Sequence, residues 1–122
     1  MTRALLALPL LFTACGPPRF SEVQDKVFTP SCVFSTCHDA AGGGGLVLTG
    51  SRAHAQLVGV PSVGAPTRTR VVAGDVANSY LVEKLSKAVP AAGALMPQGG
   101  DGLEADRLEL IKAWIAAGAK ND

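Results

Sequence analysis

Two cysteines and a histidine stand close together near the start of the chain, at Cys32, Cys37 and His38. Thiols and imidazoles are the side chains that most readily form covalent bonds or bind metals. Four residues separate the two cysteines, and the histidine directly follows the second. This short motif constrains the fold strongly, because the rest of the chain has to be arranged around whatever these groups hold.

The motif reads C-x-x-x-x-C-H, whereas the pattern C-x-x-C-H marks covalent attachment of c-type haem. In such a site two thiols add across vinyl groups on neighbouring pyrroles, and the histidine supplies an axial nitrogen to the iron. Cys37 and His38 keep the second half of that pattern unchanged. Cys32 would reach the other vinyl through a four-residue bulge, and lengthening a short loop costs little entropy.

The N-terminus has the organisation of an export signal. A positive charge at Arg3 is followed by an apolar run up to Phe12, and small residues precede Cys15. This order is typical of a secretory signal peptide, and the run is too short to cross a bilayer as a helix. Cleavage before a cysteine resembles a bacterial lipoprotein signal, with Cys15 as the lipidated residue. We therefore expect a signal peptide at 1–14, a tether at 15–19, and one domain at 20–122 on the periplasmic side of a bacterial membrane.

Three cysteines are an odd number for an exported protein. Lipidation of Cys15 leaves Cys32 and Cys37 as a pair, while the alternative places Cys15 inside an ordinary signal peptide. In an oxidising compartment the pair could form a disulfide that stabilises a small domain. Zinc bound by the pair with His38 and His54 has the right number of ligands, but adjacent side chains rarely point at one ion.

Charge and length exclude some classes of function. The 122 residues allow one domain. Without Arg3, the expected mature chain from Cys15 to Asp122 carries ten basic and ten acidic side chains, and therefore no formal net charge. Proteins that bind nucleic acid carry a basic surface, so we expect no nucleic-acid partner.

Apolar residues recur at helical spacing in several segments, and no alternation long enough for a strand is present. We expect a first helix that Pro30 ends near Thr29 and a third that Asp75 or Asn78 caps. Gly118 is expected to end the last helix. The chain thus predicts an all-α fold of three to four helices joined by long loops, which in a small domain usually carry function. The expected helices cover about 20–29 and 51–58, a segment that includes 80–85, and a last segment from just after Asp101 to 117, with Ile111 and Trp114 on its apolar face.

In this order the elements resemble the class I-like c-type cytochrome domains of bacterial exported proteins. An amphipathic helix precedes the cysteine motif, and the glycine and leucine segment 44–48 follows it. Residues 95–97, Leu-Met-Pro, resemble the distal-methionine loop, and residues 113–119 resemble the final helix. The resemblance covers about residues 20–119, and the order of the elements is its most specific feature.

The resemblance implies a small cytochrome c-like fold around one haem c that is bonded to Cys32 and Cys37. His38 would be the proximal iron ligand and Met96 the distal ligand through its sulfur. Because two protein ligands close the iron to substrate, the implied function is electron transfer to a transient redox partner protein, not catalysis. If Met96 does not bind, an open site could serve an enzyme. The haem-free alternative is a binding or structural lipoprotein with a Cys32–Cys37 disulfide.

Other residues have simpler interpretations. Methionine fills gaps in cores, which is the alternative for Met96. We expect Trp114 to be a core residue, and His54 to be an exposed helix residue that would be the reserve ligand. Arg68 and Arg70 are expected to be solvated loop charges, with haem propionates as the alternative partners.

Overall fold

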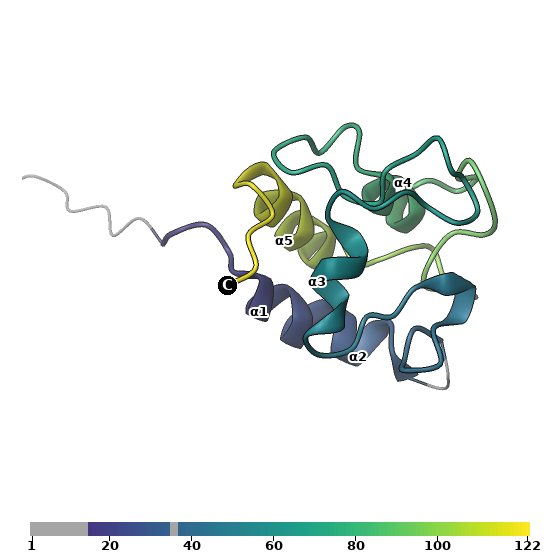
Figure 1. Ribbon diagram of the computed structural model, residues 1–122, viewed down its shortest axis with the longest axis horizontal. Helices are drawn as coiled ribbons and strands as arrows, with labels where there is room; N and C mark the ends of the chain where they lie inside the picture. Colours follow the sequence, from purple (N-terminus) through teal and green to yellow (C-terminus); the bar gives the residue numbers. More distant parts are fainter. Residues whose placement is uncertain (1–14, 35–36) are drawn as a thin grey trace, which may run out of the picture.

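The computed structural model describes residues 15–34 and 37–122, and within them the chain is helix-rich and forms no sheet. This agrees with the expected all-α class. Residues 1–14, where we expect the signal peptide, lie outside the described residues. The helices, labelled in Figure 1, are α1 (Phe20–Val23), α2 (Thr29–Ser31), α3 (Arg52–Leu57), α4 (Tyr80–Ser86) and α5 (Ala105–Ala116).

The first helix runs without a break from α1 through a π-helical turn, Gln24–Phe28, into α2. The sequence placed its end near Thr29, but the helix continues to Ser31 with Pro30 inside it. Proline normally clashes with the carbonyl four residues earlier. In the wider turn Thr29 donates its N–H to the oxygen of Gln24, five residues back, which displaces the carbonyls and makes room for the ring.

Helix α5 packs against both α1 and α4 and supplies a large part of the core. Its buried face contains Ile111, Trp114 and Ile115. Gly118 ends it as predicted: its φ is +107°, its N–H donates to Ile115 (2.9 Å), and the next N–H, of Ala119, donates to Trp114 (3.0 Å). This is a Schellman motif, which favours glycine because the left-handed conformation strains residues with a Cβ.

The C-terminal tail turns back onto the start of α1, as Figure 1 shows. Asp122 accepts the N–H of Ser21 with its main-chain oxygen (2.9 Å) and the N–H of Phe20 with Oδ1 (3.0 Å). The first N–H groups of a helix have no partner within the helix. The tail satisfies two of them and so joins the two ends of the domain.

His54 belongs to this closure, not to the exposed surface where the sequence placed it. Its Nε2 lies 2.7 Å from the oxygen of Ala119. Its ring packs edge-on against the ring of Phe20, with the two ring centroids 5.1 Å apart. Trp114 packs against the same ring and is buried, which confirms it as a core residue. A histidine held in this way reinforces the contact between α1, α3 and the tail.

The connection from α3 to α4 folds back on itself through isolated pairings between Val58 and Val71 and between Pro61 and Thr69. Neither Asp75 nor Asn78 caps α4, because Ser79 occupies that position. The following connection, 87–104, is joined to the end of α4 by a hydrogen bond from Leu103 to Leu85 (2.9 Å). Both long loops therefore return to α4.

Candidate functional site

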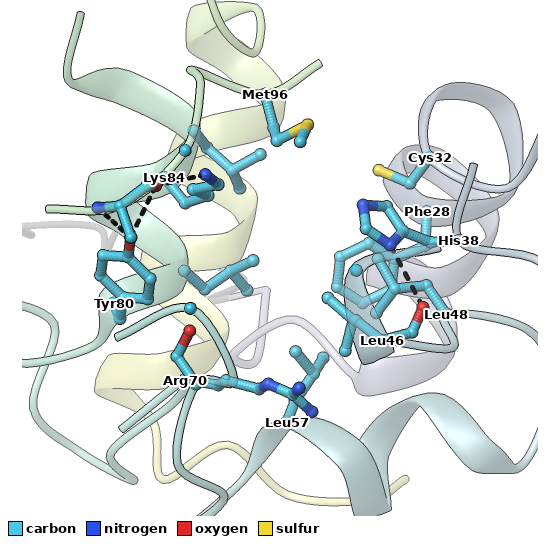
Figure 2. Close-up of a pocket in the computed structure, with 17 residues that line it drawn as sticks. Phe28, Cys32, His38, Leu46, Leu48, Leu57, Arg70, Tyr80, Lys84 and Met96 are labelled. Carbon is cyan, nitrogen blue, oxygen red and sulfur yellow. Dashed lines mark hydrogen bonds between the residues drawn. The ribbon is translucent and has the colours of Figure 1, made fainter. Parts of the chain in front are cut away.

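A cavity of about 230 Å³ lies between the first helix with its glycine-rich loop and α4 with its following loop. Figure 2 shows the residues of its two walls. We call the wall around His38 the proximal wall and the wall formed by α4 and the 90–97 loop the distal wall. The lining is mainly apolar. Its large apolar side chains are Phe28, Leu46, Leu48, Leu57, Leu81 and Leu85.

His38 contributes one ring nitrogen to the cavity. Its Nδ1 lies 3.1 Å from the oxygen of Leu46, and since a carbonyl can only accept, Nδ1 carries the proton. In the neutral form of the ring, Nε2 therefore carries the lone pair, and the ring lines the cavity (Figure 2). Main-chain bonds from His38 to Cys32 (3.0 Å) and from Leu48 to His38 (2.8 Å) hold the residue in place. Histidines that bind metals commonly donate their other ring N–H to a carbonyl, as Nδ1 of His38 does here.

Cys32 lies at the C-terminal end of the first helix, lines the cavity and is buried. Its Sγ is 3.9 Å from the oxygen of Val27, and Figure 2 shows the sulfur near the ring of His38. Burial raises the pKa of Cys32 to about 11, although the positive charge of Arg107 opposes the shift. At neutral pH this side chain is therefore a thiol and a weak nucleophile.

Cys37 is exposed and does not line the cavity, although it directly precedes His38. Its N–H donates to Phe34 (3.2 Å), and its oxygen accepts from Gly43 (2.9 Å). Residues 35–36, between the two cysteines, lie outside the described residues. Three of the four predicted cofactor-binding residues thus line one cavity, and Cys37 lies at the surface beside it.

Met96 comes from the distal wall. Its N–H donates to the oxygen of Lys84 at 2.8 Å, and its half-buried side chain lines the cavity. Figure 2 shows its sulfur directed toward the wall that carries Cys32 and His38. A thioether, a thiol and an imidazole nitrogen are thus brought together, although Met96 is more than fifty residues from the motif.

Arg70 was not recognised from the sequence as a buried residue, yet it is only 8% exposed and lines the cavity. It donates from Nη1 to the oxygen of Gln56 (2.8 Å) and from Nη2 to that of Gly45 (3.0 Å). Burial lowers the pKa of Arg70, and within residues 15–34 and 37–122 it forms no ion pair. A buried cation without a counter-ion is costly, so the cavity suits a ligand with an anionic group.

Arg68 differs from Arg70, although only one residue separates them. It forms an ion pair with Glu83, and its guanidinium lies 5.1 Å from the centre of the Tyr80 ring. The expectation of solvated loop charges is therefore wrong for Arg70 and incomplete for Arg68. The apolar pair after Arg70, Val71 and Val72, is the sequence signal that could have indicated a segment returning to the core.

The glycine-rich loop carries the chain from His38 to the leucines of the proximal wall. Gly42, Gly44 and Gly45 all have positive φ, between 63° and 73°, a conformation that side chains with a Cβ rarely adopt. Gly44 lines the cavity, and Gly45 presents its oxygen to Arg70. The four glycines thus form tight turns at the edge of the site.

The donor set fits a haem better than a structural metal ion. An oriented imidazole, a facing thioether and an adjacent thiol are the groups that hold haem iron and its vinyl carbons. For zinc, no group of three or more His, Cys, Asp or Glu side chains close enough to share an ion occurs in the described part of the chain. His54 packs against α1 and does not line the cavity, so it is not placed as a reserve ligand.

Comparison of the chain with known protein families, with curated proteins and with solved structures gives no match in any of the three. Among the described residues, no helix has the length and apolar character that crossing a membrane requires. The motif and the cavity are therefore the features of this chain that indicate a function.

Proposed function

We propose that the protein is a lipid-anchored, exported electron carrier with a small cytochrome c-like fold and one covalent haem c. The observation that carries this proposal is the shared cavity of Cys32, His38 and Met96. Cys32 and His38 are neighbours in the motif, and the fold brings Met96 to them from a distant loop.

Each residue has a chemical task in this proposal. The Nε2 atom of His38 would hold the iron from the proximal wall, and the bond between Nδ1 and Leu46 fixes the ring and would make Nε2 a better donor. The sulfur of Met96 would hold it from the distal wall, and such a ligand favours a higher reduction potential than a second histidine. Cys32 and Cys37 would supply the sulfurs of the two thioethers. The bound haem supplies an iron that exchanges one electron.

The apolar lining excludes water, and low solvent exposure is one of the means by which a protein sets the potential of bound iron. Arg70 offers its buried positive charge to a carboxylate of the ligand. Because His38 and Met96 would both hold the iron, no position on it would be left for a substrate. This argues for electron transfer and against an enzyme.

The proposed partners follow from the surface and the N-terminus. Val63, between the cavity-lining residues Ser62 and Gly64, and Phe34, two residues after Cys32, are exposed apolar side chains. Such a surface suits the small, transient interfaces of redox proteins. We propose that lipid on Cys15 holds the domain at the periplasmic side of a bacterial membrane, and we propose no nucleic-acid partner.

A pyridine haemochrome spectrum and an intact mass of protein produced with a c-type haem maturation system test the proposal. We expect one covalent haem in the unmodified chain. In His38→Ala we expect no low-spin haem, because the iron would have lost its proximal ligand. His54→Ala is the matched control, because the other histidine lies outside the cavity, and it should retain the haem.

A mass without haem, combined with a disulfide between Cys32 and Cys37, would overturn the proposal and support the haem-free binding or structural lipoprotein. Separately, a Cys15→Ser variant should leave the membrane fraction. Its retention there would contradict the lipid anchor while leaving the haem proposal intact.

A further inference from the structure

The segment 90–97, which carries Met96, has no helix or strand of its own, and side chains of α4 hold it. The hydroxyl of Tyr80 accepts the N–H of Ala92 (3.0 Å) and donates to its oxygen (3.1 Å). The ammonium of Lys84 donates to the same oxygen at 2.7 Å. Both polar main-chain atoms of Ala92 are thus bound by side chains of a single helix. Figure 2 shows Tyr80 and Lys84, from which these bonds run.

Two further bonds extend this attachment along the segment. Glu83 accepts the N–H of Ala91 at Oε1 (2.8 Å), and the main-chain oxygen of Lys84 accepts the N–H of Met96 (2.8 Å). The segment is therefore fixed at 91–92 and again at Met96, with only three residues between the two points. This short span restricts the positions that the sulfur of Met96 can take.

Among these groups, loss of the hydrogen bonds of the Tyr80 hydroxyl should cost the most free energy, because Tyr80 is buried. Tyr80 is buried, whereas Ala91 and Gly93 are exposed. A buried polar group that loses its partner costs more free energy than an exposed one that can turn to water. The packing is also close: a Cβ on Gly93, whose φ is +66°, would lie 2.8 Å from the Nζ of Lys84.

We propose that Tyr80 is a positioning residue for Met96, and that its two hydrogen bonds to Ala92 determine how firmly the methionine sulfur stays on the iron. Lys84 assists through its bond to the same oxygen. The inference rests on the proposed function, because it assumes that Met96 is the distal ligand. It adds the residues that set the strength of that ligation.

Added imidazole competes with the methionine for the iron, so its apparent affinity measures how readily Met96 is displaced. In haem-loaded protein we expect Tyr80→Phe to keep the ring, the haem content and the His38 ligation. It should bind imidazole about tenfold more tightly than the unmodified chain, which is the effect of about one buried hydrogen bond. Lys84→Met should shift the affinity in the same direction by a smaller factor.

Ser86→Ala is the matched control, since its hydroxyl lies on the same helix but donates to Val82 within α4. This variant should leave the imidazole affinity unchanged. Equal affinity in Tyr80→Phe and the unmodified chain would overturn the positioning role alone. An unmodified chain without covalent haem would overturn the proposed function, and the positioning role with it. Hydrogen exchange at residues 91–96 provides a second readout, and faster exchange is expected in Tyr80→Phe.

Discussion

The two walls of the cavity are built by different means. The proximal wall is held mainly by main-chain hydrogen bonds, such as those that join His38 to Cys32 and to Leu48. The distal wall depends on side chains, because Tyr80, Glu83 and Lys84 all reach from α4 to the loop before Met96. Main-chain bonds survive most substitutions, whereas side-chain bonds disappear with a single one. The distal wall should therefore be the more easily altered half of the site.

The largest expected effect concerns the buried thiol of the proximal wall. Because burial raises the pKa of Cys32 from 9.0 to about 11, its thiolate fraction at pH 8 should be about a hundredfold lower in the folded chain than in urea. Iodoacetamide labelling of haem-free, reduced protein, followed by peptide mass mapping, measures this difference. Cys37 is exposed and is the internal control. Fast labelling of Cys32 in the folded protein would show that the proximal wall is open.

A stability test addresses the distal wall. Gly102 has a φ of +96°, and a Cβ there would lie 2.6 Å from the oxygen of Leu85. We expect Gly102→Ala to lower the free energy of unfolding by about 1–3 kcal/mol, because both the backbone and the contact become strained. Gly100→Ala is the matched control, since its added Cβ meets an oxygen at an ordinary 3.8 Å. Urea unfolding that shows no difference between the two variants would refute this packing.

The buried cation between the walls should respond to the ligand. Arg70→Met removes a guanidinium that has no ion-pair partner in the described residues. The loss of unfolding free energy should be greater by about 1–3 kcal/mol in haem-loaded than in haem-free protein, because only the loaded form supplies an anion. Arg68→Met, which breaks the ion pair with Glu83, should cost the same in both forms. If Arg70→Met lowers the unfolding free energy equally in the haem-loaded and haem-free forms, Arg70 has no role in binding the ligand.

The smallest expected effect is a pH dependence confined to the distal wall. The hydrogen bond from Arg68 lowers the pKa of the Glu83 carboxyl from 4.5, and the N–H of Ala91 adds to the shift. A lowered pKa in the folded state stabilises the fold above the unfolded value, and this contribution is lost as the pH falls below about 4.5 and through the lowered pKa. The protection factor of the Ala91 N–H, which is the exchange rate of an unfolded peptide at the same pH divided by the observed rate, should therefore fall in acid.

The control for this titration is Glu83→Gln, which keeps the shape of the side chain but cannot ionise. Its protection factor at Ala91 should be less dependent on pH across the same range. If the unmodified chain and the variant follow the same curve, protonation of Glu83 is not what loosens the loop in acid.

The sequence identified correctly those features that depend on neighbouring residues. The apolar stripe of α5 contained Ile111 and Trp114, and Gly118 ended the helix, because helical periodicity and the left-handed conformation of glycine are local properties. Met96 was assigned to the site from the resemblance and not from a local property, and its side chain lines the cavity. The covalent haem itself remains a prediction.

Other features arise only when distant segments meet. Arg70 is buried because the loop before α4 folds back beside α3, and His54 is held by the C-terminal tail. The attachment of Ala92 to Tyr80 joins residues twelve positions apart through a side chain. Periodicity and spacing report which face of a segment is apolar. They do not report which segment will cover that face, since this depends on how the whole chain excludes water from its core.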